Sequence, residues 1–345
     1  MKGGEGMNLG IFFGAALILA GGILQGTFAV PMKYARKWSH ENIWLVFCFT
    51  GMVAFPWILT AATVPSLAQV YASTAARTLW LIVLCGLLWG VGATLTGIGL
   101  RLLGIGLGFA VILGLSASVG SMVPLLVLTP EKIFSPQGIY YLVGTLVMFG
   151  GIALVAVAGS LREKAGGAQG RPAGSSFVTG LLVCIASGVL SSLLNFGYAF
   201  GAEAIENARR LGASPVWASG VAAAPTTTGG FVANLLYCAW NMRRNHTFSR
   251  YWIPGAGGHW LLGLTMGAFW YGGLAAYGMG IFRMGAFGTV AGWSLLMGAI
   301  MVSSNVAGLA TGEWRHAGRR AKGYLFAGSA VILAAIGILS MAQGS

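Results

Sequence analysis

The sequence predicts an all-α integral membrane protein, with about ten transmembrane helices arranged as two inverted five-helix repeats. Three observations lead to this fold class. Of the 345 residues, 57% are hydrophobic and only 8% are charged, whereas a soluble domain carries roughly 25% charged residues. Apolar runs of membrane-spanning length recur along the whole chain, and its two halves share a pattern of glycine and tryptophan. Soluble enzymes, secreted disulfide scaffolds and disordered chains are thereby excluded.

Each predicted span is an apolar run bounded by charges or turn residues, since a helix needs about 20 residues to cross the hydrocarbon core. The runs are 9–31, 42–63, 78–100, 105–127, 138–160, 176–199, 215–240, 259–280, 286–311 and 323–341. Their near-continuous hydrophobicity argues against the shorter, alternating strands of a membrane β-barrel. The first run is expected to stay in the mature protein, because Pro31 and Lys33 do not resemble a small-residue cleavage site.

Glycine is unusually frequent, with 56 residues against an average of roughly 7%. Small residues let membrane helices approach closely, so we expect a tightly packed bundle. The four cysteines, which all fall within apolar runs, are expected to be packing residues.

The net charge of +13 is interpreted as a topology signal rather than a nucleic-acid patch, and no nucleic-acid partner is predicted. Fourteen of the 20 Lys and Arg lie in the odd-numbered loops between spans. The positive-inside rule places those loops in the cytoplasm. With ten spans, both termini are then periplasmic.

The repeat appears when the chain is shifted by about 181 residues, which pairs Trp89 with Trp270, Gly92 with Gly273 and Gly99 with Gly280. A weaker match pairs the first span with the sixth. An odd number of spans per half inverts one half relative to the other. The predicted division is a first repeat over 1–160, a polar linker over 161–175 and a second repeat over 176–345.

Groups for chemistry are scarce, since all seven acidic residues are Glu and the chain has no Asp. There is no Walker loop, and no histidine or cysteine is spaced as a metal ligand. The sequence therefore predicts no enzyme, no catalytic residues, no metal and no cofactor.

Polar and aromatic side chains inside the spans indicate a binding pocket, because such groups are costly in hydrocarbon. We expect the pocket to be lined by Gln25, Trp89, Asn195, Trp270, Tyr271 and Trp293. Aromatic faces and amides suit a neutral sugar or polyol. The alternatives are hydrogen bonding between helices for the amides, which also include Asn234 and Asn305, and membrane-interface anchoring for Trp270 and Trp293.

Candidates for proton coupling are Glu206 and Glu41 near span ends, with His259 as a third. The alternative for each carboxylate is a solvated charge at the end of a span.

Three segments carry a resemblance to a known family. They are Pro31–Trp44, Trp89–Gly108 and Glu313–Arg320. They resemble the bacterial L-rhamnose–proton symporter family, and the similarity runs along nearly the whole chain. The resemblance implies a ten-helix fold of the drug/metabolite transporter superfamily. It also implies import of a deoxy sugar with a proton across the bacterial inner membrane.

The resulting prediction is a sugar–proton symporter for L-rhamnose or a related sugar, whose partners are the sugar, the proton and the lipid bilayer. One alternative is a facilitator or exporter of another small metabolite. Another is a membrane sensor that binds sugar without translocating it. The oligomeric state is left open.

Overall fold

A computed structural model describes residues 2–103, 108, 111–117, 119–120, 134–165, 177–285, 288–312 and 314–341. Within these ranges the regular structure is entirely helical. The long α-helices are α1 (Lys2–Thr27), α5 (Ala76–Leu103), α7 (Pro136–Ala165), α11 (Gly220–Asn245), α12 (Ala256–Arg283), α13 (Gly288–Ala310) and α14 (Arg319–Met341). The shorter helices are α2 (His40–Phe49), α3 (Phe55–Thr63), α4 (Leu67–Ser73), α8 (Phe177–Ser191), α9 (Leu193–Phe200) and α10 (Ala202–Arg210). The described residues also form two short 3-10 helices, η1 (Val30–Tyr34) and η4 (Phe248–Trp252), and one π-helical turn, η2 (Thr50–Ala54).

The prediction of an all-α membrane protein is confirmed. Among the described residues, 7 helical segments are long and apolar enough to span a membrane. The helix α12 has 28 residues and covers the predicted span 259–280. The helix α11 has 26 residues and overlaps the predicted span 215–240 from Gly220 onward. Most of the predicted span 105–127 lies outside the described residues. The total of ten spans therefore stays a prediction, as does the division into repeats.

Two predicted spans are interrupted. The span 42–63 consists of α2, η2 and α3, because Pro56 lacks the N–H that an α-helical hydrogen bond to Met52 would need. A π-turn accommodates such a missing bond. The span 176–199 is divided at Ser192 into α8 and α9, and α10 then forms where the sequence predicted a loop.

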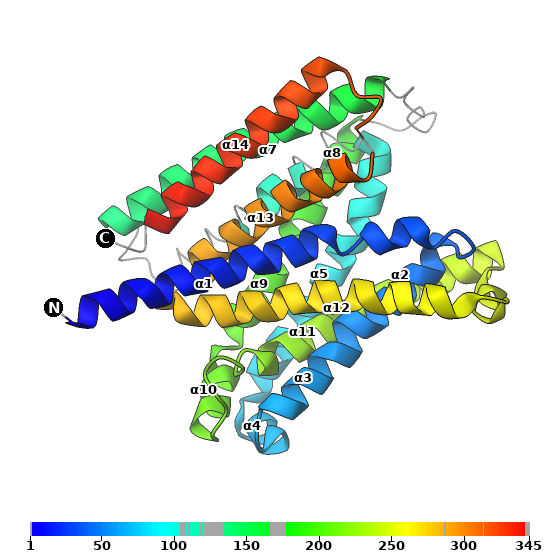
Figure 1. Cartoon of the computed structure of the whole chain (residues 1–345). Coiled ribbons are helices and arrows are strands. Elements are labelled where there is room, and N and C mark those ends of the chain that lie inside the picture. The colour runs from blue at the N-terminus through cyan, green and yellow to red at the C-terminus, as the bar shows by residue number, and fades with distance from the viewer. Residues whose placement is uncertain are drawn as a thin grey trace.

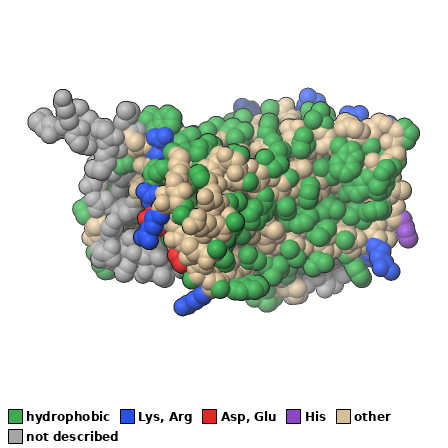
Figure 2. Space-filling view, turned by 90° about the horizontal axis from the view of Figure 1, so that it is seen from below, with side chains coloured by type: hydrophobic (Ala, Val, Ile, Leu, Met, Phe, Trp, Pro, Cys, Tyr) green, Lys and Arg blue, Asp and Glu red, His purple; other side chains and the backbone are tan. Residues whose placement is uncertain are grey.

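The helices form a bundle with one pair, α7 and α14, side by side along its edge (Figure 1). The start of α1 and the end of α14 lie at the same end of the bundle (Figure 1). Figure 2 shows a broad hydrophobic middle, with most of the visible charged side chains toward the two ends. This distribution suits a chain that crosses a bilayer.

Glycines set the closest helix crossings. In the α1–α12 pair, a Cβ added at Gly21 would lie 2.6 Å from the carbonyl oxygen of Gly273, and one at Gly280 would lie 2.7 Å from that of Gly14. The two helices are therefore antiparallel, with their backbones in contact. In the α5–α8 pair, a Cβ at Gly92 would lie 2.8 Å from the Leu190 side chain.

Candidate substrate site

Trp89 and Trp270 form an aromatic stack in the interior of the bundle. Trp89 lies thirteen residues from the start of α5 and fourteen from its end, and Trp270 lies at the matching midpoint of α12. The two rings stack with centroids 5.6 Å apart and an interplanar angle of 22°. Both side chains are buried, at 8% and 7% exposure. The predicted repeat equivalents thus meet face to face at the midpoints of their helices.

Gln25 joins α1 to this stack. Its buried Nε2 donates a hydrogen bond to the Trp270 carbonyl oxygen at 3.2 Å. Phe47 of α2 packs edge-on to Trp270, with centroids 6.1 Å apart. Tyr271 is buried beside them but turns to a separate small space of about 10 Å³ that it shares with Thr60 and Ser219.

Asn195 and Trp293 belong to a second cluster, which is centred on Tyr277. Tyr277 lies on α12 two helical turns after Trp270. The Tyr277 hydroxyl donates to Asn195 Oδ1, and Asn195 Nδ2 donates to the Gly120 carbonyl at 2.7 Å. The Trp293 indole packs edge-on against Tyr277 and donates to the Ser116 carbonyl at 3.0 Å. Trp270 and Tyr277 are about 10 Å apart along one face of α12, from a rise of about 1.5 Å per residue.

Five of the six residues expected to line the pocket therefore lie in two adjoining buried clusters, and not in one open cavity, while Tyr271 faces a separate space. The two clusters together form the aromatic layer, which consists of Gln25, Trp89, Asn195, Trp270, Tyr277 and Trp293. Trp270 and Trp293 are buried among helices, which argues against membrane-interface anchoring for both. The amides do bond between helices, as the alternative for them held. Sequence reasoning missed Tyr277, although its seven-residue spacing from Trp270 places it on the same helical face. Asn234 accepts the Trp44 indole N–H at 3.1 Å.

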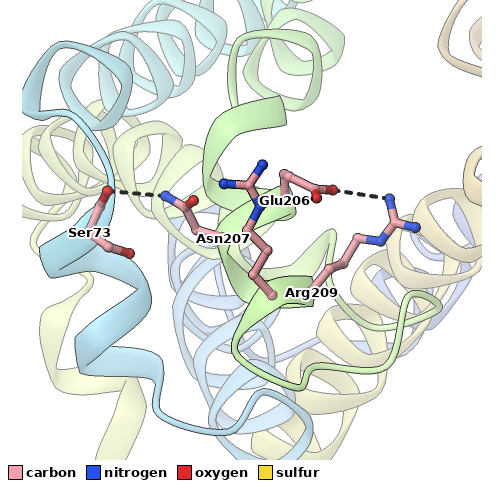
Figure 3. Close-up of polar contacts among 5 residues, drawn as sticks. Ser73, Glu206, Asn207 and Arg209 are labelled. Carbon is pink, nitrogen blue, oxygen red and sulfur yellow. Dashed lines mark hydrogen bonds and ion pairs between the residues drawn. The ribbon is translucent and has the colours of Figure 1, made fainter.

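Glu206 lies on α10 and pairs with the arginines that follow it on the same helix. Its carboxylate oxygens lie 3.3 Å from Arg209 Nη1 and 3.4 Å from Arg210 Nε. Figure 3 shows this pair on one side of α10, while Asn207 reaches the Ser73 carbonyl on the other side. The Glu206 side chain is 47% exposed, as expected for a carboxylate near a span end.

Glu41 and His259 are held in place by the loops around them. Glu41 is buried at the start of α2, and its Oε1 accepts hydrogen bonds from Asn245 Nδ2 at 3.1 Å and Thr247 Oγ1 at 2.8 Å. His259 Nε2 accepts the Lys37 backbone N–H at 3.3 Å. The two residues thus fasten α2 and α12 to neighbouring loops.

Two cavities lie toward opposite ends of the bundle. The Glu206 cavity, of about 450 Å³, is lined by residues of α9, α10 and α12 that include Tyr198, Glu206, Arg209 and Gly278. The Asn305 cavity, of about 400 Å³, lies between α1, α7 and α13, and its lining includes Gly26, Arg162 and Asn305. The Glu206 cavity is lined by the C-terminal part of α12, and the Asn305 cavity by the C-terminal end of α1. The two aromatic clusters lie between these two regions.

A multi-pass helical bundle with a buried aromatic and amide layer, and with cavities toward both ends, has the organisation of a membrane transporter. The chain belongs to the L-rhamnose-proton symport protein (RhaT) family, because the sequence model of that family matches residues 7–345. It is thus a member of a family of transporters and not of enzymes.

Curated relatives extend along almost the entire chain. An L-rhamnose-proton symporter of Escherichia coli O17:K52:H18 is 27% identical over 346 residues, which cover 98% of this chain and 99% of the relative. One from Klebsiella pneumoniae is 28% identical over 98% of this chain and 100% of the relative. One from Shigella dysenteriae is 27% identical over 98% of this chain.

Proposed function

We propose that this protein imports L-rhamnose together with a proton across the bacterial inner membrane, with both termini periplasmic. The curated relatives are named L-rhamnose-proton symporters, and the family description matches the chain from residue 7 to its end. The observation that carries the proposal within the structure is the stack of Trp89 on Trp270 at the midpoints of α5 and α12. Transporters built from inverted repeats bind substrate near the bilayer midplane at the repeat interface.

In this proposal the aromatic layer recognises the sugar through two kinds of contact. The tryptophan faces pack against C–H groups of the sugar ring, and amides such as Gln25 and Asn195 exchange hydrogen bonds with its hydroxyls. Entry of the sugar requires the two rings to separate, because they are in contact in this structure. Movement of α12 relative to α5 supplies that opening.

We assign proton coupling to Glu206 in preference to Glu41 and His259. Glu206 lines a cavity and pairs with Arg209, so protonation would neutralise the carboxylate and release this arginine. Glu41 is committed to Asn245 and Thr247, and His259 accepts a backbone N–H. A carboxylate that alternates between paired and neutral forms can link proton binding to a conformational change.

The experiment is uptake of a panel of sugars into proteoliposomes, with and without an imposed pH gradient. L-Rhamnose is expected to accumulate above its external concentration only when the outside is more acidic. No uptake of any sugar under the gradient contradicts the proposal. Sugar binding without flux would instead identify a sensor.

A facilitator is the second candidate, and the position of the acidic residues favours it. The carboxylates that the structure describes lie near helix ends: Glu41 in α2, and Glu203 and Glu206 in α10. Counterflow measured without a pH gradient separates the two candidates. A facilitator exchanges sugar at the same rate with and without the gradient and does not accumulate it.

A further inference from the structure

The Asn305 cavity has the size of a small-molecule site. Its volume of about 400 Å³ falls within the range of roughly 300–1,000 Å³ that is usual for ligand pockets. It lies where the C-terminal parts of α1, α7 and α13 approach one another. These parts lie at the same end of the bundle (Figure 1), which is the end of the basic, odd-numbered loops.

One wall of this cavity is polar. Asn305 Nδ2 is buried and makes no hydrogen bond within the part of the chain that the structure describes. The neighbouring Ser304 hydroxyl donates to the Met301 carbonyl at 3.0 Å, which leaves its oxygen able to accept a hydrogen bond. A buried donor without a partner is unusual in a folded protein, so a ligand with acceptor oxygens would complete this wall.

The facing wall is apolar and belongs to α7, where Ile152, Val155 and Ala156 line the cavity. Trp314 also lines the cavity, and the guanidinium of Arg162, the last α7 residue of the lining, lies over its ring at 4.8 Å from the centroid. A deoxy sugar has matching chemistry, because hydroxyls occupy one side and a methyl group with C–H bonds the other. Lys33 also lines the cavity and donates to the Thr311 hydroxyl at 2.6 Å, so both cations of the lining, Arg162 and Lys33, are engaged by protein groups.

The cavity begins next to the aromatic layer. Gly26 lines it, and the preceding residue, Gln25, donates to the Trp270 carbonyl. The helices α1 and α13 pack closely at this point: Ser303 Oγ donates to the Gly22 carbonyl at 3.0 Å, and a Cβ added at Gly22 would meet Ala299. Separation of α13 from α1 at this contact would connect the stack to the cavity.

Resting on the proposed function, we propose that the Asn305 cavity is a second sugar subsite, through which the sugar passes between the aromatic layer and the odd-loop side of the membrane. Asn305 donates a hydrogen bond to a sugar hydroxyl there, and the α7 wall contacts the methyl group. Asn305 is therefore a substrate-contacting residue outside the set that the sequence predicted.

The first test replaces Asn305→Ala and measures L-rhamnose binding and uptake by the purified, reconstituted protein. Affinity is expected to fall roughly three- to tenfold, which is the effect of one lost hydrogen bond. Asn241→Ala is the matched control, because its amide donates to the Tyr237 carbonyl within α11 and lines neither cavity. Unchanged affinity and uptake in a stably folded Asn305→Ala variant would overturn the inference.

The second test asks whether the cavity is open to water and sugar. Ser304→Cys is expected to react with a membrane-impermeant maleimide added from the odd-loop side of oriented vesicles, and sugar is expected to slow the reaction. Val306→Cys, two residues on and 59% exposed on the outside of the bundle, is expected to resist the reagent because lipid covers it. The four native cysteines are buried and give a low background.

The two tests distinguish failure of this inference from failure of the proposed function. Absence of Ser304→Cys labelling from either side, in an active protein, would overturn the subsite. Labelling that another transported sugar blocks, but L-rhamnose does not, would keep the subsite and correct the substrate. Labelling that no transported sugar affects would also overturn the subsite.

Discussion

At the scale of single residues, the buried layer is held by hydrogen bonds that join helices distant in the chain. Gln25 connects α1 to α12, and Asn195 connects α9 to α12 and to the Gly120 carbonyl. Polar groups in such positions have partners because an unpaired polar atom in hydrocarbon is costly. In the proposed function, the same amides exchange these protein partners for sugar hydroxyls.

Tyr277→Phe tests this layer directly. Removing the hydroxyl deprives Asn195 Oδ1 of a buried donor, and we expect the free energy of unfolding to fall by about 0.5–1.5 kcal/mol. Thermal unfolding in detergent measures the change, with uptake measured in parallel. Tyr34→Phe, at a position that is 62% exposed, should leave the Tm unchanged, and equal Tm values for both variants would refute this role.

Glu206→Gln tests proton coupling. The amide cannot titrate, so accumulation driven by the pH gradient should fall to the level seen without a gradient, while counterflow is retained. The control is Glu203→Gln, since Glu203 accepts the Ala75 N–H at 2.9 Å and the Thr78 hydroxyl and does not line the Glu206 cavity. Gradient-driven accumulation that persists in Glu206→Gln would exclude Glu206 as the coupling group.

At the scale of helices, the close crossings support the predicted repeat. Gly99 and Gly280 are repeat equivalents, and a Cβ on Gly280 would meet Ile18 while one on Gly99 would meet Cys184. Ile18 and Cys184 are themselves equivalent under the weaker match between the first and sixth spans. The α5–α8 and α12–α1 pairs therefore use corresponding residues, as an internal repeat would, and the inversion of the two halves stays a prediction.

The α1–α12 crossing predicts a strong position effect for glycine substitution. Gly21→Ala places a methyl group 2.6 Å from the Gly273 carbonyl oxygen, and we expect a loss of about 1–3 kcal/mol through overpacking. Gly10→Ala in the same helix has no atom within 4 Å of the added methyl group and should be neutral. Thermal unfolding of the two purified variants gives the comparison, and a Gly21→Ala protein as stable as Gly10→Ala would contradict the close packing.

At the scale of the whole molecule, the basic residues and the helix directions predict the topology. Arg77 is the second residue of α5, and Arg320 is the second residue of α14. The starts of these two helices lie toward opposite ends of the bundle (Figure 1). Arg320→Cys should react with an impermeant maleimide from the cytoplasmic side and Arg77→Cys from the periplasmic side. Reaction of both from the same side would refute the alternating arrangement, and reaction from exchanged sides would refute only its orientation.

The sequence by itself determined the membrane class, most span positions and most residues of the aromatic layer, but not Tyr277. Hydrophobicity over 20 residues is a local property, so 8% charge and long apolar runs are sufficient to identify membrane helices. The pairing of Trp89 with Trp270 in the repeat identified two residues that do stack. Polar residues within apolar runs, such as Gln25 and Asn195, were recognisable because they are exceptions there.

Only the tertiary structure decided which of these residues touch and where space remains. The division of the pocket residues into two clusters depends on the rotation of α12 that directs Trp270 and Tyr277 to the interior while Tyr271 turns to Thr60. The Asn305 cavity depends on three helices, α1, α7 and α13, that are far apart in the chain. Such contacts arise from packing between segments that are distant in the chain. A local pattern of residues cannot show how far apart two such segments lie in the folded protein.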